Sequence, residues 1–201
     1  MQAHMEIEVK LRVADLAALK KLLRARHARW GKRVHECNVL FDTPQGRFRR
    51  RDELVRLRTN DGAGILTFKG RARPRPKGRK GRCKIRHETE FAVSNPRAAA
   101  SFLSGLGLVE SFRYEKYRTE LRVSAVLKAH VYLDETPIGA FVEIEGAPAA
   151  IDRAARLLGY QPADYITESY LALYARHCRV HGRAMGDLVF ALRKKSRNTS
   201  V

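Results

Sequence analysis

The chain has 201 residues and a mass of 22.9 kDa, which is enough for one domain that buries a hydrophobic core. Its 44% hydrophobic and 30% charged residues exclude an intrinsically disordered protein, and the lack of an apolar run of about 18 residues excludes a membrane-spanning helix. We find no secretory signal, and the three cysteines are too widely spaced for a CxxC zinc motif or a disulfide framework. We therefore expect a cytoplasmic globular protein.

The excess of basic residues is concentrated in two segments. The net charge of +19, from 40 basic and 21 acidic residues, indicates an anionic partner. Residues 71–84 carry eight basic and no acidic side chains, and residues 176–201 carry seven basic and one acidic. Without the +8 and the +6 of these segments, the rest of the chain has a net charge of only +5. The folded body is thus mildly basic.

The first predicted element is a strand over residues 5–13, in which apolar and charged residues alternate. All odd positions are apolar, and the even positions place Glu6, Glu8, Lys10 and Arg12 on the opposite face. A helix is predicted over residues 14–28, where leucines recur at helical spacing.

The remaining chain predicts seven more strands and four more helices. In chain order, the strands cover 36–42, 54–60, 64–69, 85–93, 113–123, 130–135 and 139–146, and the helices cover 96–106, 148–158, 165–178 and 185–195. Residues 70–84, rich in Gly, Pro, Arg and Lys, are interpreted as a mobile loop between two strands, and the chain from about Ser196 as a disordered tail. Many antiparallel strands with a few amphipathic helices are typical of the α+β class.

Like charges recur two residues apart on the charged faces of these strands. Acidic pairs begin at Glu6, Glu88 and Glu143, and basic pairs begin at Arg56 and Lys116. A solvated outer face is the usual place for alternating charge in an antiparallel sheet. Like charges so placed repel each other unless a counter-ion or ligand lies between them. An eight-stranded barrel with charged residues inside and amphipathic helices outside meets this requirement and predicts bound metal, anion or water.

Six motifs with these charges follow one another between residue 5 and about residue 175. They are Glu6-x-Glu8-x-Lys10, Val55-Arg56-Leu57-Arg58, Leu66-Thr67-Phe68-Lys69-Gly70, Glu88-x-Glu90, Lys116-x-Arg118, and Leu133-Asp134-Glu135 with Gly139-x-Phe141-Val142-Glu143-Ile144-Glu145-Gly146. In order and approximate spacing the series resembles the CYTH, or triphosphate tunnel metalloenzyme, superfamily. The resemblance implies an eight-stranded antiparallel barrel that forms a tunnel, in a domain over residues 5–178. A basic C-terminal helix and tail over 179–201 would follow it.

The resemblance also implies ligands and residue roles. The substrates would carry a linear triphosphate, as in inorganic triphosphate, thiamine triphosphate, RNA 5′-ends or ATP, and the cofactor would be Mg²⁺ or Mn²⁺. By position, the residues that would hold the catalytic metal are Glu6, Glu8, Glu143 and Glu145, assisted by Asp134, Glu88 and Glu90. The residues that would bind phosphate oxygens are Lys10, Arg56, Arg58, Lys69, Lys116 and Arg118. These residue types suit the chemistry, because Mg²⁺ and Mn²⁺ prefer carboxylate oxygens and Arg binds phosphate bidentately.

One position departs from the family pattern. The sequence leaves three functions open. Glu168 stands where many hydrolytic members carry a Lys just before a Ser-Tyr pair, which removes one phosphate-binding cation. The first expected function is metal-dependent hydrolysis of a triphosphate. The alternatives are a class IV-type adenylyl cyclase, which makes cyclic AMP and pyrophosphate from ATP, and an RNA or polyphosphate binder that uses loop 70–84 and the tail without turnover. Either a monomer or a homodimer is compatible with the sequence.

Overall fold

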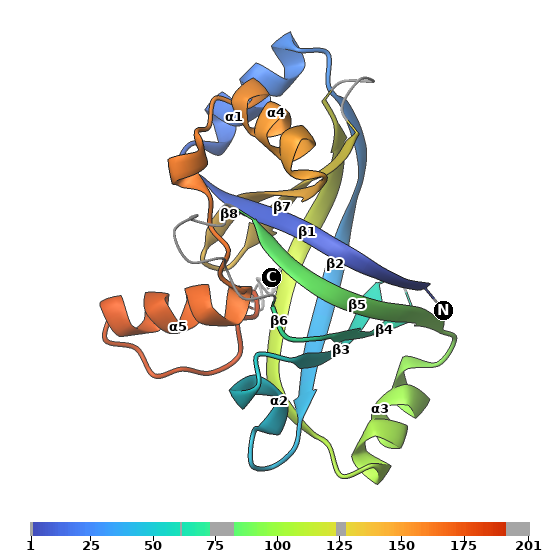
Figure 1. The fold of residues 1–201 in the computed structure, drawn as a ribbon. Helices are drawn as coiled ribbons and strands as arrows, with labels where there is room; N and C mark the ends of the chain where they lie inside the picture. Colours follow the sequence, from blue (N-terminus) through green and yellow to red (C-terminus); the bar gives the residue numbers. More distant parts are fainter. Residues whose placement is uncertain (1, 61, 73–82, 124–127, 192–201) are drawn as a thin grey trace, which may run out of the picture.

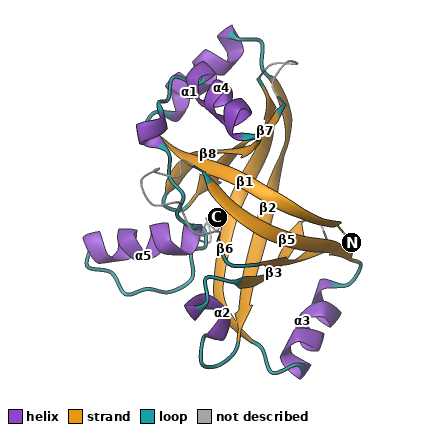
Figure 2. Cartoon of the chain, viewed as in Figure 1, coloured by secondary structure: helices purple, strands orange, loops and turns teal. Residues whose placement is uncertain are grey.

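Eight antiparallel strands close into a barrel whose neighbours follow the order β1-β5-β4-β3-β2-β6-β7-β8 (Figures 1 and 2). The structure is a computed structural model that describes residues 2–60, 62–72, 83–123 and 128–191. The strands are β1 Gln2–Val13, β2 Arg29–Asp42, β3 Leu54–Asn60, β4 Ala63–Lys69, β5 Lys84–Val93, β6 Val109–Arg122, β7 Ala129–Thr136 and β8 Gly139–Gly146. The predicted fold class and all eight predicted strands are confirmed.

Strands β2 and β6 begin earlier than the alternation predicts. They pair with each other from Arg29 and Arg122 to Asp42 and Val109, with register shifts between Trp30 and Arg33 and again after Leu40. A register shift places an additional residue in one strand and so interrupts the period of two. The alternating pattern therefore underestimates the length of both strands.

Helices connect and flank the strands, and side-chain caps fix where three of them begin. The helices are α1 Leu16–Ala25, α2 Arg47–Arg50, α3 Pro96–Gly105, α4 Pro148–Leu157 and α5 Tyr170–Val180, with a 3₁₀ turn η1 over Pro162–Asp164. Asp15, Asn95 and Ser169 accept hydrogen bonds from backbone N–H groups in the first turns of α1, α3 and α5. The predicted helix 165–178 thus begins only at residue 170.

The short helix α2 was not predicted, since its sequence of one Phe and three Arg has no helical periodicity. The buried carboxylate of Asp42 holds it instead. Asp42 accepts hydrogen bonds from the backbone N–H groups of Phe48 at 2.8 Å and Arg49 at 3.0 Å. The side chain of Asp42 on the preceding strand therefore stabilises a helix that its own sequence does not favour.

The prediction of a helix over 185–195 is wrong for residues 185–191, which run beside β6 without helical structure. Leu188 forms a parallel bridge with Tyr114, and its N–H donates to the Arg113 carbonyl at 2.9 Å. Strand β7 pairs with β6 only from Tyr117 onward, so the earlier backbone groups of β6 are available to this segment. Residues 192–201, and residues 73–82 of the predicted loop, lie outside the described residues.

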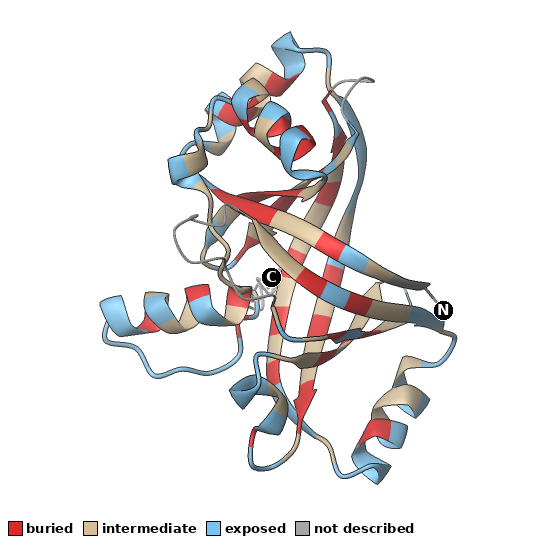
Figure 3. Ribbon diagram, in the orientation of Figure 1, coloured by how far each residue is buried: buried red, intermediate tan, exposed pale blue. Residues whose placement is uncertain are grey.

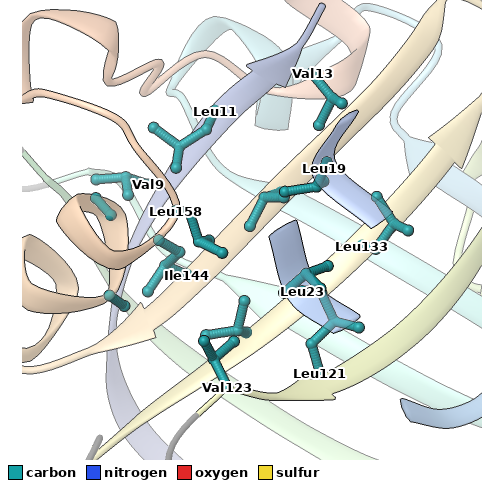
Figure 4. Packing of buried hydrophobic residues seen from close by; sticks show 14 of the residues in the cluster. Val9, Leu11, Val13, Leu19, Leu23, Leu121, Val123, Leu133, Ile144 and Leu158 are labelled. Atoms are coloured by element: carbon teal, nitrogen blue, oxygen red, sulfur yellow. The ribbon is translucent and has the colours of Figure 1, made fainter. Parts of the chain in front are cut away.

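The apolar outer face of the barrel packs against α1 and α4 (Figures 3 and 4). Val9 and Leu11 of β1 are fully buried there, together with Leu23 of α1 and Ile151 of α4. Helix α3 covers a separate patch on β3 and β4 through Leu103, which is 5% exposed. The predicted helical cover of the outer face is confirmed for these three helices. No helix in the described ranges has the length and apolarity needed to cross a membrane.

Helix α5 has a different position from the predicted one. Tyr114 and Phe141 lie on the same strand faces as the charged residues Lys116 and Glu143, because they are two residues away from them along β6 and β8. These inward-facing aromatic side chains pack with α5 and with Leu188 of the C-terminal segment, in a cluster of Phe112, Tyr114, Phe141, Tyr170, Leu173 and Leu188. Helix α5 therefore packs against inward-facing residues of the barrel through Tyr170 and Leu173, and not against its outer face.

We expect Leu11→Ala to lower the free energy of unfolding by about 2–5 kcal/mol, because it removes a fully buried side chain between β1 and the helices. Leu106→Ala is the matched control, since Leu106 is 63% exposed and its loss costs about 0.5 kcal/mol or less. Urea unfolding monitored by circular dichroism measures both. Equal effects of the two substitutions would contradict the assigned outer core.

Candidate functional site

The barrel interior contains a cavity of about 190 Å³ whose wall is almost entirely charged or polar. Its lining includes residues from all the predicted site motifs. Twelve of the thirteen predicted site residues line it: Glu6, Glu8, Lys10, Arg56, Arg58, Lys69, Glu88, Glu90, Lys116, Arg118, Glu143 and Glu145. The thirteenth, Asp134, is fully buried behind the wall. The charged faces thus meet around one interior cavity, which is partly open to solvent, as the inverted barrel predicts.

Strand register determines which charged side chains are neighbours. On one side of β1, Glu8 lies opposite Lys84 of β5. On the other side, Glu8 lies opposite Glu145 and Lys10 lies opposite Glu143 of β8. Directly opposed carboxylates repel each other, so the Glu8–Glu145 pair favours a cation between the two strands.

Lys10 is the cation that the structure places between Glu8 and Glu143. Its Nζ lies 3.3 Å from Glu8 Oε1 and 3.2 Å from Glu143 Oε1. Burial and the charge of Glu143 act to raise the pKa of Glu8, but the combined charges of Lys10, Lys69 and Lys84 outweigh them and lower that pKa to about 2. Burial likewise opposes ionisation of Glu143, and Lys10 and Lys116 hold its pKa well below the usual range. Both carboxylates are therefore ionised at neutral pH.

Two other carboxylates of the cavity resist ionisation. Burial and the neighbouring charge of Glu8 raise the pKa of Glu6, and burial and the charge of Glu6 raise the pKa of Glu145. Lys69 partly compensates, since its Nζ donates to both carboxylate oxygens of Glu6 at 2.6 Å and lies 3.0 Å from Glu88 Oε2. Negative charge is therefore in excess around Glu6 and Glu145.

Asp134 is the centre of a buried hydrogen-bond network behind the cavity wall. Its carboxylate accepts from Lys116 Nζ at 2.8 Å, from Arg118 Nε at 2.7 Å and Nη2 at 2.6 Å, and from the Tyr170 hydroxyl at 2.8 Å. Arg118 also donates to Glu143. Asp134 thus fixes the two basic side chains of β6 where they face the cavity.

The two arginines of β3 have no short ion pair within the described ranges, although Arg56 donates hydrogen bonds to Thr67 at 3.3 Å and to the Tyr114 hydroxyl at 3.5 Å. Arg56 Nη2 lies 3.8 Å from Glu88 Oε1, and Arg58 Nη1 lies 3.7 Å from Glu36 Oε1. Both distances exceed hydrogen-bond range. Glu36 is 5% exposed and was not predicted as part of the site, although it shares a strand face with Asn38, two residues further along β2.

The sequence interpretation also missed other cavity-lining residues, which are His4, Leu54, Lys84, Tyr114, Tyr132, Ser169 and Tyr170. Lys84 could have been found, because it precedes Arg86 by two residues and so continues the charged face of β5. Burial and the charge of Lys10 lower the pKa of Lys84 to about 8, against the opposing charge of Glu8.

Glu168, the residue that departs from the family pattern, does not line the cavity. Its carboxylate pairs with Arg176 at 3.2 Å, and both side chains are more than 40% exposed. The next two residues, Ser169 and Tyr170, do line the cavity. Glu168 therefore adds no negative charge to the cavity wall.

The carboxylates fit a divalent cation by donor type. Glu6, Glu8, Glu143 and Glu145 offer hard oxygen ligands, which Mg²⁺ and Mn²⁺ prefer, and their mutual repulsion favours an added positive charge. Lysine partners occupy several of these oxygens, and across the described residues no three acidic, His or Cys side chains form a ready-made metal cluster. Binding a cation here requires the ion pairs to open.

The chain is similar to known proteins in sequence and in fold. A family model described as the CYTH domain matches residues 4–170. A candidate adenylate cyclase from Vibrio parahaemolyticus has a similar structure, with a TM-score of 0.68, 20% identity, and coverage of 87% of this chain and 99% of that chain. A protein from Pyrococcus horikoshii OT3 has a TM-score of 0.65 at 23% identity, with coverage of 84% and 98%.

A third similar structure is a candidate adenylyl cyclase from Hippeastrum that is described as having a dominant triphosphatase activity. Its TM-score is 0.63 at 19% identity, and 90% of this chain and 97% of that chain are covered. A search of curated proteins found no significant match. The structural neighbours share the fold, and the family model covers most of the sequence, so the chain belongs to the CYTH domain family.

Proposed function

We propose that the protein is a divalent-metal-dependent phosphohydrolase that acts on a linear triphosphate bound in the barrel cavity. The observation that carries this proposal is the interior cavity itself, in which four metal-suited carboxylates of β1 and β8 lie beside basic side chains of β3, β4 and β6. Such an arrangement can hold a cation and a phosphate chain side by side. Hydrolysis then requires water to attack a terminal phosphorus while the bridging P–O bond breaks, which releases orthophosphate.

In this proposal the carboxylates of Glu6, Glu8, Glu143 and Glu145 hold Mg²⁺ or Mn²⁺, with Glu88 and Glu90 nearby. A bound divalent cation neutralises phosphate charge and lowers the pKa of a bound water. Asp134 was expected to assist the metal. Its position favours another role, because its oxygens already accept from Lys116, Arg118 and Tyr170. We propose that Asp134 positions these basic side chains.

The basic side chains bind the phosphate oxygens. Arg56 and Arg58 suit bidentate contacts, because their guanidinium groups are not committed to short ion pairs. Lys10, Lys69, Lys116 and Arg118 supply further positive charge along the wall. The phosphate chain would then be fixed at several points, and positioning with charge stabilisation is most of what phosphoryl transfer requires of a protein.

A second candidate is a class IV-type adenylyl cyclase. A larger cavity of about 780 Å³ shares Leu54, Tyr114, Ser169 and Tyr170 with the charged one, and its wall includes apolar and basic residues such as Phe112 and Arg49. This space can accept an organic group attached to the triphosphate. In the cyclase the nucleophile is the ribose 3′-hydroxyl in place of water.

Incubation of the purified protein with Mg²⁺ or Mn²⁺ and, separately, inorganic triphosphate, thiamine triphosphate and ATP tests these proposals. Orthophosphate release supports hydrolysis, and cyclic AMP with pyrophosphate supports the cyclase. Both activities should disappear with EDTA. Binding that is unaffected by EDTA, weakens steeply with salt and gives no product would instead support a polyphosphate or RNA binder.

We expect Glu8→Gln to lower kcat/KM by about 100-fold or more, because loss of a direct metal ligand should cost at least as much as loss of an outer-shell partner. The substitution preserves shape, so the thermal unfolding midpoint serves as the check on folding. Glu168→Gln is the control, since Glu168 lies outside the cavity and should retain activity. Full activity of the Glu8→Gln protein would refute the metal assignment.

We expect Arg58→Ala to raise KM by about tenfold to a hundredfold with a smaller change in kcat, because one charge-assisted contact to phosphate is lost. Steady-state kinetics with inorganic triphosphate measure this effect. Arg33→Ala is the matched control, because Arg33 is 49% exposed and pairs with Glu135 away from the cavity. An unchanged KM and kcat for Arg58→Ala would remove Arg58 from the site.

A further inference from the structure

Lys84 is a basic residue of the cavity wall that none of the matched motifs contains. It is the first residue of β5, lies opposite Glu8 of β1, and its side chain is 12% exposed. It is also the last residue of the basic segment 71–84, and it enters the barrel wall as part of a strand. Its ammonium group therefore belongs to the interior.

Of the four lysines that line the cavity in the described part of the chain, three have short ion pairs and Lys84 does not. Lys10 has two carboxylate partners within 3.3 Å, and Lys69 has two within 3.0 Å. Lys116 lies 2.8 Å from Asp134. Lys84 has a single carboxylate partner among the described residues, Glu8, at 3.8 Å.

That partner is shared, because Glu8 already lies 3.3 Å from Lys10. Besides Glu8, the largest charge effects on the Lys84 ammonium come from Lys10 of β1, Arg86 of β5 and Lys69 of β4, and all three are positive. The positive charge of Lys84 is thus poorly compensated by the protein. A buried cation of this kind is stabilised by an added anion.

The backbone places Lys84 next to the segment that carries Ser169 and Tyr170. The edge of β1 that pairs with β5 continues past Lys84, the first residue of β5. There Lys10 of β1 pairs with Ile166, and the two backbones exchange hydrogen bonds of 2.8 and 2.9 Å. Glu8 and Lys10 are two residues apart, so their partners Lys84 and Ile166 are separated by about 7 Å along this edge. Lys84 therefore lies beside the segment in which Glu168 turns outward.

We propose that Lys84 binds a phosphate group of the triphosphate directly and thereby supplies the cation that position 168 does not. The proposal rests on the proposed function, because it concerns the same cavity and the same class of substrate. The alternative role for Lys84 is that of a counter-ion that only neutralises Glu8. A counter-ion would act on the carboxylate, whereas a phosphate-binding residue acts on the ligand even when that carboxylate is neutral.

Calorimetric titration of the 201-residue chain with inorganic triphosphate, in EDTA and without divalent metal, tests the proposal apart from turnover. We expect Lys84→Gln to weaken binding by about tenfold to a hundredfold, and Lys84→Arg to retain most of the affinity. Lys21→Gln is the control for the loss of one positive charge, because Lys21 is exposed on α1, and it should bind as the unmodified chain does.

The same titration in a Glu8→Gln background separates the two roles of Lys84. If Lys84 contacts phosphate, Lys84→Gln weakens binding in this background as well. If Lys84 only neutralises Glu8, the second substitution has no further effect, and the proposal is overturned. Unchanged affinity of the single Lys84→Gln variant also overturns it while the proposed hydrolysis stands. A chain that binds triphosphate but never releases orthophosphate refutes the hydrolysis and leaves the Lys84 result valid.

Discussion

The enclosure of opposite charges inside the barrel is the constraint on which the rest of the structure depends. Seven Lys and Arg side chains and six Glu side chains line the cavity, so its wall is close to neutral. An unpaired ion in such an interior would be costly, and the short contacts between Lys69 and Glu6 and between Lys10 and Glu143 offset much of that cost. Because the inner face is polar, the apolar core lies outside the barrel, where α1 and α4 cover it.

This neutrality has a consequence for the proposed chemistry. A divalent cation that takes the carboxylates of Glu8 and Glu143 would release Lys10 from both of its partners. The released ammonium could then bind a phosphate oxygen, so that one set of ion pairs is exchanged for another. On this account cation and triphosphate favour each other's binding, since each compensates the charge that the other leaves exposed. The same reasoning explains why a loosely paired residue such as Arg58 suits the first contact with the anion.

Much of the fold and of the cavity lining could be predicted from the sequence, because strands with one charged face have a strict period of two. Alternation located all eight strands, and the motifs located twelve cavity residues. The errors arose where tertiary contacts override local pattern. Asp42 holds a helix that has no periodicity of its own, and β6 holds Leu188 in an extended segment where a helix was expected. Lys84 was assigned to a loop because its neighbours are basic, although its spacing from Arg86 continues the charged face of β5, and the register places it opposite Glu8.

A crystal structure of the protein with Mn²⁺ and a non-hydrolysable imido analogue of triphosphate tests the central claim most directly. The account predicts an anomalous manganese signal beside Glu8 and Glu143 inside the barrel, with the phosphate chain against Arg56 and Arg58. Manganese and analogue bound on the outer surface, with the interior ion pairs unchanged, would contradict it.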